Sequence, residues 1–190
     1  MKTSRQPVFI SQVARMQPLL QFAILFLVLA AGFCIRIVDL KDPPLDFHAA
    51  RQLRSAIISR SFYYQLDLQN DPVLRQKAVQ LGQLEVYEPP MLEALVGFTD
   101  FLAGSEYFWF GRIYNALFWC LGGAAMFGTA RRFLSFPAAL TGLLFYLFLP
   151  FSVIASRSFQ PDAWMVMWIL VTIYALVRWS EQPTHWKWTI

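Results

Sequence analysis

The chain has 190 residues, of which 57% are hydrophobic and 17% are aromatic, and its formal net charge is only +4. A soluble domain of this length cannot bury so much apolar surface, so the composition excludes that class and indicates an integral membrane protein. No basic tract is interleaved with exposed aromatic residues, so no nucleic-acid partner is expected.

The first apolar run covers residues 18–35 and is long enough to cross a hydrocarbon core about 30 Å thick. Basic residues precede it without any acidic residue, which predicts a cytoplasmic N-terminus and a first membrane span at about residues 18–38. A cleaved signal peptide is the competing interpretation. The bulky Phe33 before Cys34 argues against a lipoprotein cleavage site, and the run is long for a signal core.

Residues 39–106 hold most of the acidic residues and are predicted to form one large external loop with helices of its own. The first of these, at about residues 49–64, is predicted from an amphipathic pattern. Its apolar face carries Ala50, Leu53, Ile57 and Tyr64, and its polar face carries Arg51, Ser55 and Ser59. A second, shorter helix follows Asp71 and Pro72, a pair that is typical of a capped helix start.

The segment at residues 87–104 is apolar and helical in pattern, but it is short and contains two acidic residues, Glu93 and Asp100. A charge at membrane depth is costly, so this segment is predicted to lie at the interface and not to cross the membrane. That choice also leaves the Arg131-Arg132 pair on the cytoplasmic side, as the positive-inside tendency favours.

Three further apolar runs complete the predicted membrane domain. They cover about residues 108–130, 137–155 and 162–179. The second of them is expected to bend near Pro150, and Gly122-Gly123 in the first permit close helix contact. The predicted fold is therefore an all-α integral membrane protein with about four transmembrane helices, forming one polytopic domain over residues 1–190.

Two polar clusters fall on the same side of the membrane in this topology. They are Asp46, His48, Arg51 and Arg54 after the first span, and Arg157 and Asp162 between the last two spans. A carboxylate can take a proton, and a guanidinium can hold a phosphate. Together they suit a lipid-phosphate substrate whose head is outside and whose tail lies in the bilayer.

Each of these residues also has a plain structural interpretation. Asp46 is a natural N-cap for a helix that starts near Phe47. Asp162 suits the positive end of the last helix, and Arg157 can extend its charge from the lipid to water. His48, taken alone, is more often a loop or packing residue than a ligand.

A series of short motifs follows in a fixed order along the chain. They are Pro43-Pro44-Leu45-Asp46, Glu88-Pro89-Pro90, Gly111-Arg112, Arg131-Arg132-Phe133, Ser156-Arg157 and Pro161-Asp162. Through this order the chain resembles the N-terminal part of family 39, the protein-O-mannosyltransferase-like group of C-type membrane glycosyltransferases. It is also similar to the lipid A aminoarabinose transferases.

The resemblance implies a transferase that moves a sugar from a polyprenyl- or dolichyl-phosphate donor to a protein, lipid or glycan acceptor. It carries the family's catalytic acid onto Asp46 and its second external acid onto Asp162. In physical terms Asp46 is expected to act as general base, Arg157 to clamp the phosphate and Asp162 to orient the acceptor or the base. His48, Arg51 and Arg54 are candidate contacts of the donor head.

The chain departs from its relatives in two ways. Many of them have Asp-Glu in the first loop, where this chain has Asp46-Phe47-His48. No cofactor is predicted, and no ligand spacing supports a divalent metal near Asp46 and His48. Relatives are also several times longer, so the chain is expected to be an N-terminal fragment, inactive alone, of an enzyme in the cell membrane. The alternative function is a non-catalytic membrane scaffold or assembly partner.

Overall fold

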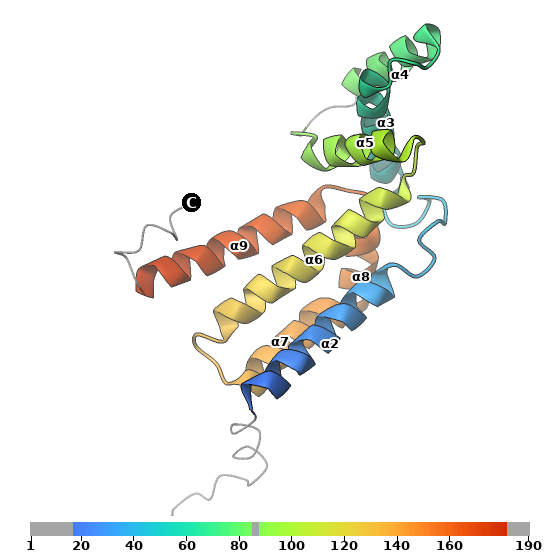
Figure 1. Cartoon of the computed structure of the whole chain (residues 1–190). Helices are drawn as coiled ribbons and strands as arrows, with labels where there is room; N and C mark the ends of the chain where they lie inside the picture. Colours follow the sequence, from blue (N-terminus) through green and yellow to red (C-terminus); the bar gives the residue numbers. More distant parts are fainter. Residues whose placement is uncertain (1–16, 85–87, 182–190) are drawn as a thin grey trace, which may run out of the picture.

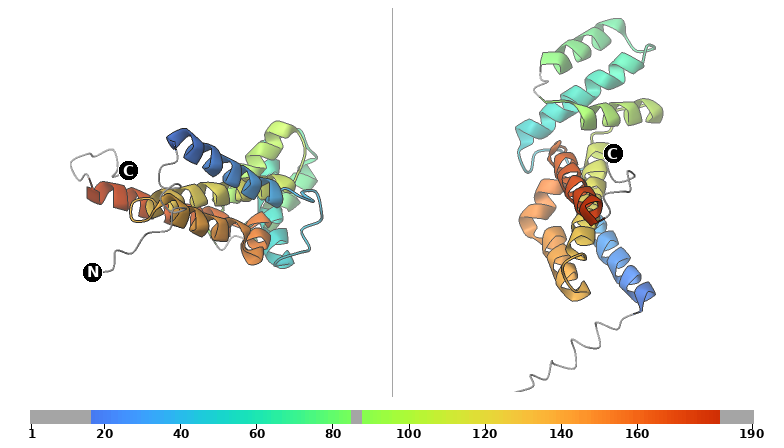
Figure 2. Two further views of the ribbon diagram at one scale, coloured as in Figure 1. Left: turned by 90° about the horizontal axis from the view of Figure 1, so that it is seen from below. Right: turned by 90° about the vertical axis from the view of Figure 1, so that its left-hand side faces the viewer.

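The computed structural model describes residues 17–84 and 88–181, and these residues form eight α-helices and no strand. The prediction of an all-α fold is confirmed for this part of the chain. Five helices form a bundle, and the other three gather at one end of it (Figures 1 and 2). We call this group of three helices the cap.

The bundle consists of α2 (Pro18–Arg36), α6 (Trp109–Ala130), α7 (Phe136–Phe148), α8 (Pro150–Arg157) and α9 (Asp162–Glu181). Helices α2, α6 and α9 are each long and apolar enough to cross a membrane. Helices α7 and α8 meet at an angle of 57° and are apolar and long enough only as a pair, which makes them a broken span or a re-entrant loop. The described residues thus contain three candidate membrane spans, or four if the bent pair counts as one.

Helix α6 lies at the centre of the bundle, with α2 and α7 on one side and α9 on the other. Its glycines permit this close packing. A Cβ added to Gly123 would lie 3.1 Å from Leu143, and a Cβ added to Gly122 would lie 3.3 Å from the backbone of Met167 in α9. The predicted use of these two glycines for close helix contact is confirmed.

The break between α7 and α8 follows from Pro150, which has no backbone N–H to donate to the carbonyl of Tyr146. The indole Nε1 of Trp119 donates to that carbonyl instead, at 3.3 Å. One residue further on, Nη2 of Arg36 donates to the carbonyl of Leu147 at 2.8 Å. The predicted bend near Pro150 is confirmed, and two side chains from other helices bond carbonyls beside it.

Arg36 is fully buried near the end of α2. Its other guanidinium nitrogens donate to the carbonyl of Gly32 and to the hydroxyl of Ser156 in α8, both at 2.6 Å. The guanidinium therefore ties α2 to both halves of the broken span. Burying a charge is costly unless it has hydrogen-bond partners, and these acceptors provide them.

The cap consists of α3 (Ala49–Leu66), α4 (Pro72–Leu84) and α5 (Met91–Ala103), with α3 packed against both of the others. The predicted cap of α4 is confirmed, because the N–H of Val73 donates to Asp71 Oδ1 at 3.1 Å. Helix α5 has only 13 residues and is not among the helices that could cross a membrane. This agrees with its predicted place at the interface.

The burial of α3 does not follow its amphipathic pattern, because residues of both faces are buried. Leu53 and Ile57 are 44% and 36% exposed, whereas Ser55 and Ser59 on the opposite face are buried. Small side chains allow the close approach of α5 on that face. A Cβ added to Gly97 of α5 would lie 2.5 Å from the carbonyl oxygen of Ser59. Because α3 packs against α4 and α5, its buried serines act as small side chains in these contacts.

Candidate functional site

The loop after α2 carries the predicted acid, but Asp46 is not the N-cap of the next helix. Helix α3 starts at Ala49, and its N-cap is His48, whose φ of 53° is left-handed and whose side chain makes no capping bond. The N-cap interpretation of Asp46 was therefore wrong. The physical reason is that the Asp46 carboxylate interacts with the side chains of Gln52 and Arg112.

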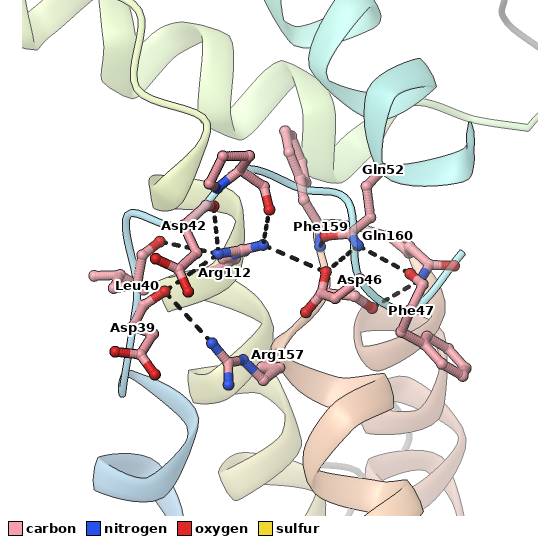
Figure 3. Close-up of polar contacts among 12 residues, drawn as sticks. Asp39, Leu40, Asp42, Asp46, Phe47, Gln52, Arg112, Arg157, Phe159 and Gln160 are labelled. Atoms are coloured by element: carbon pink, nitrogen blue, oxygen red, sulfur yellow. Dashed lines mark hydrogen bonds and ion pairs between the residues drawn. The ribbon is translucent and has the colours of Figure 1, made fainter. Parts of the chain in front are cut away.

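Two side chains converge on Asp46 from opposite sides (Figure 3). Nε2 of Gln52 donates to Oδ1 of Asp46 at 2.7 Å, and Nη2 of Arg112 lies 3.5 Å from the same oxygen. Gln52 is fully buried and Arg112 is nearly so, but the Asp46 side chain is 41% exposed. The acid is thus held from the protein side and open on the other.

Arg112, near the start of α6, holds the backbone of the same loop. Its Nη1 donates to the carbonyls of Asp42 at 2.8 Å and Leu40 at 3.2 Å, and more weakly to Asp39 at 3.5 Å. Its Nη2 lies 3.4 Å from the carbonyl of Pro43. A single guanidinium therefore gathers four loop carbonyls, as its planar fork of five N–H donors allows.

Arg157, at the end of α8, contacts the same loop from below (Figure 3). Its Nη2 donates to the carbonyl of Val38 at 2.7 Å and lies 3.4 Å from that of Asp39. The side chain therefore reaches the loop backbone and not only open solvent. The structure brings Arg157 and Asp46 to opposite ends of one short loop.

Asp162 starts α9, as its predicted preference for a helix N-terminus requires, and it forms an ion pair with Arg51. The two guanidinium nitrogens of Arg51 lie 3.0 and 3.3 Å from the two Asp162 oxygens, and Glu88 is 3.9 Å away. Arg51 neighbours Gln52, so adjacent residues of α3 contact the two predicted acids. All three charged side chains are at least 39% exposed.

His48 and Arg54 are placed less directly. His48 is exposed, and its ring lies 4.2 Å from the ring of Phe47. Arg54 lines a small hollow of about 30 Å³ together with Arg51, Ser55 and Glu93. Within residues 17–84 and 88–181 no group of three or more His, Cys, Asp or Glu is arranged to hold a metal ion.

Glu93 is a further buried acid at this site, on the first turn of α5. It is only 4% exposed, and Oε1 accepts a hydrogen bond from the Ser55 hydroxyl at 2.8 Å. Burial raises the pKa of Glu93, and the hydrogen bond from Ser55 opposes this shift. In the sequence, this residue indicates only that the segment does not cross the membrane.

Asp100, on the last turn of α5, is 2% exposed and accepts a hydrogen bond from the N–H of Tyr107 at 2.9 Å. Burial raises its pKa from 3.8 to about 6. Because the folded protein binds this proton more tightly, the free energy of unfolding is expected to fall as the pH rises from about 4 to about 6. A shift of this size corresponds to about 3 kcal/mol.

Asp100→Asn should remove this contribution, because an amide keeps the hydrogen bond from Tyr107 without a charge. We expect the variant to unfold at a higher temperature than the natural protein at pH 7 and at the same temperature at pH 4. Thermal unfolding in detergent at the two pH values measures this. Asp71→Asn is the control, since asparagine caps as well as aspartate. An equal effect of Asp100→Asn at both pH values would contradict the prediction.

An open apolar groove of about 580 Å³ runs along α9 from Asp162 to Ile173. Its apolar wall includes Met165, Trp168 and Ile169, which are each at least half exposed. At one end it reaches the residues before α5, including Glu88 and Pro89. The ion pair of Asp162 and Arg51 therefore stands at the polar end of an apolar groove.

Sequence reasoning missed Gln52 and gave Arg112 no role. A usable signal existed for Arg112, because a charged residue within an apolar run of membrane length is functional by default. No comparable signal existed for Gln52. It lies six residues after Asp46, in a helix whose amphipathic pattern does not show that Gln52 is buried.

Comparison with known proteins bears on the part of the chain from residue 87 onward. The sequence profile described as dolichyl-phosphate-mannose-protein mannosyltransferase matches residues 87–190, which include Arg112, Arg157 and Asp162. No curated protein and no solved structure gives a significant match. Because the profile covers more than half of its residues, the chain belongs to the dolichyl-phosphate-mannose-protein mannosyltransferase family.

Proposed function

We propose that the protein transfers a sugar from a polyprenyl- or dolichyl-phosphate carrier to a hydroxyl acceptor, with Asp46 as the general base. Family membership implies a membrane glycosyltransferase that uses a lipid-phosphate sugar. The observation that carries the proposal is the Asp46 carboxylate, which is 41% exposed and yet fixed by a buried amide and a buried guanidinium. A general base needs both access to its substrate and a defined position.

The groove along α9 supports a lipid-linked donor. Its apolar wall suits a polyprenyl chain, and its polar end adjoins Arg51 and Asp162. Arg157 is proposed to bind the phosphate. Its bonds to loop carbonyls use Nη2, so the donors of Nη1 are left for phosphate oxygens. Arg51, Arg54 and His48 are proposed as further contacts of the donor head, and Asp162 as the group that orients the acceptor.

The acceptor is proposed to bind on the non-cytoplasmic side, with the N-terminus of the protein in the cytoplasm and the protein in the plasma membrane. The support is the distribution of charge. Arg132 and Arg178, at the ends of α6 and α9, both contact Glu181 at the end of the bundle away from the cap. Basic residues favour the cytoplasmic side, which leaves the cap and the Asp46 loop outside.

Sugar transfer tests the proposed function. Membranes that contain the full-length protein are incubated with dolichyl phosphate carrying radiolabelled mannose. We expect label to leave the lipid-extractable fraction and to enter the acceptor fraction, because the apolar groove and the basic residues offer sites for both parts of this donor. Membranes without the protein, and GDP-mannose in place of the lipid donor, are the controls. Transfer from GDP-mannose alone, or no transfer at all, would contradict the proposal.

A further inference from the structure

The side chain of Gln52 is fixed in one orientation. It is fully buried, and its carbonyl Oε1 accepts a hydrogen bond from the N–H of Phe159 at 3.0 Å. Its Nε2 donates to the carbonyl of Phe47 at 2.9 Å and to Oδ1 of Asp46 at 2.7 Å. A backbone N–H can only donate and a backbone carbonyl can only accept. The amide therefore cannot turn over, and a donor always faces the acid.

Gln52 and Arg112 act on the same carboxylate oxygen. Both approach Oδ1 of Asp46, and among the described residues no donor reaches Oδ2. The lone pairs of Oδ1 are thus engaged by two donors from the protein, and Oδ2 is the oxygen that stays available to a substrate.

Gln52 also links Asp46 to the turn that precedes Asp162. Phe159, which donates to Gln52, is fully buried in that turn, and Gln160 beside it donates to the carbonyl of Phe47 at 3.3 Å. One side chain of α3 thus holds the loop of the first acid against the segment that leads to the second.

We infer that Gln52 is a positioning residue for Asp46, which fixes the carboxylate through Oδ1 and presents Oδ2 to the proton of the acceptor. This inference rests on the proposed function, because it gives Gln52 a part in the proposed proton transfer. The competing interpretation is that Gln52 only joins three segments of the fold. The two differ in how a change at Gln52 affects the ionisation of Asp46.

Gln52→Glu separates the two interpretations. Glutamate has the same shape and still accepts from Phe159, but it places a second carboxylate oxygen where the donor was, 2.7 Å from Asp46 Oδ1. Two carboxylates at this distance share a proton, and the pair loses its second proton only at raised pH. In the full-length protein we expect the acid limb of kcat/KM against pH to move up by about one pH unit or more.

Gln65→Glu is the matched control, because Gln65 lies on the same helix, is exposed and donates a hydrogen bond to Ser61, away from Asp46. Its pH profile should equal that of the natural protein. Gln52→Met provides a second variant, which removes the donor without adding a charge. We expect it to lower kcat with little change in KM for dolichyl phosphate mannose, while thermal unfolding in detergent shows that the variant is folded.

The outcomes distinguish this inference from the proposed function. An acid limb that stays in place in Gln52→Glu, with activity unchanged or reduced equally at every pH, would overturn the positioning role. If Gln52→Glu does not fold, a folded Gln52→Met with normal kcat would overturn it as well. Full turnover by Asp46→Asn, or no turnover by the natural protein, would remove the proposed function and this inference together.

Discussion

Asp46→Asn is expected to lower sugar turnover by about 10²–10⁴-fold, the usual contribution of general base catalysis. An amide oxygen is too weak a base to take the acceptor proton. It can still accept hydrogen bonds, so Gln52 and Arg112 keep their partner and the loop should keep its position. Initial rates of transfer from dolichyl phosphate mannose, corrected for the amount of protein in the membrane, measure the effect.

The matched control for this change is Asp42→Asn, four residues earlier in the same loop. Asp42 is exposed and contributes its backbone carbonyl to Arg112, which the substitution leaves intact. We expect its turnover to be normal. Near-normal turnover in Asp46→Asn would remove the proposed base and would favour a scaffold or assembly role for the protein.

Arg112→Met is expected to abolish measurable turnover by releasing the loop that carries Asp46. The Arg112 side chain is 1% exposed, and its loss removes one donor from each of four loop carbonyls and from the Asp46 carboxylate. Each hydrogen bond of this kind contributes about 1 kcal/mol net. Part of this cost is avoided if the loop moves into water, and that movement would displace Asp46.

Limited digestion with trypsin in detergent measures this movement at Lys41, which is exposed and lies between two residues whose carbonyls bond Arg112. Cleavage after Lys41 should be faster in the variant. Arg60→Met is the control, because it removes a largely exposed ion pair with Glu106, worth at most about 1 kcal/mol, and a cation–π contact with Tyr64, both away from the loop. Unchanged cleavage and turnover in Arg112→Met would show that the loop needs no such anchor.

Much of the fold was predictable because it depends on local pattern. The apolar runs that form α2, α6 and α9 have about the length needed to cross a bilayer. The break between α7 and α8 was predictable because Pro150 lacks the N–H that would bond the carbonyl four residues earlier in a helix. The start of α4 at Asp71 was predictable for the same local reason.

The candidate site was less predictable because its bonds join residues far apart in sequence. Arg112 reaches back about seventy residues to the loop, and Gln52 contacts the turn at Phe159. The orientation of the buried Gln52 amide depends on the backbone groups around it, and the spacing of hydrophobic residues in the sequence gives no information about these groups. The burial of α3 was not predictable for a related reason, since hydrophobic periodicity places the core on the apolar side, whereas Gly97 and Ser59 allow close contact on the other side as well.

The broken span also has a mechanical consequence for the site. Pro150 and the carbonyls bonded by Trp119 and Arg36 prevent α7 and α8 from joining into one straight rod. The angle between the two helices sets the direction in which α8 extends to Arg157. Because Arg157 bonds the loop that carries Asp46, a change of packing at the bend is expected to shift that loop.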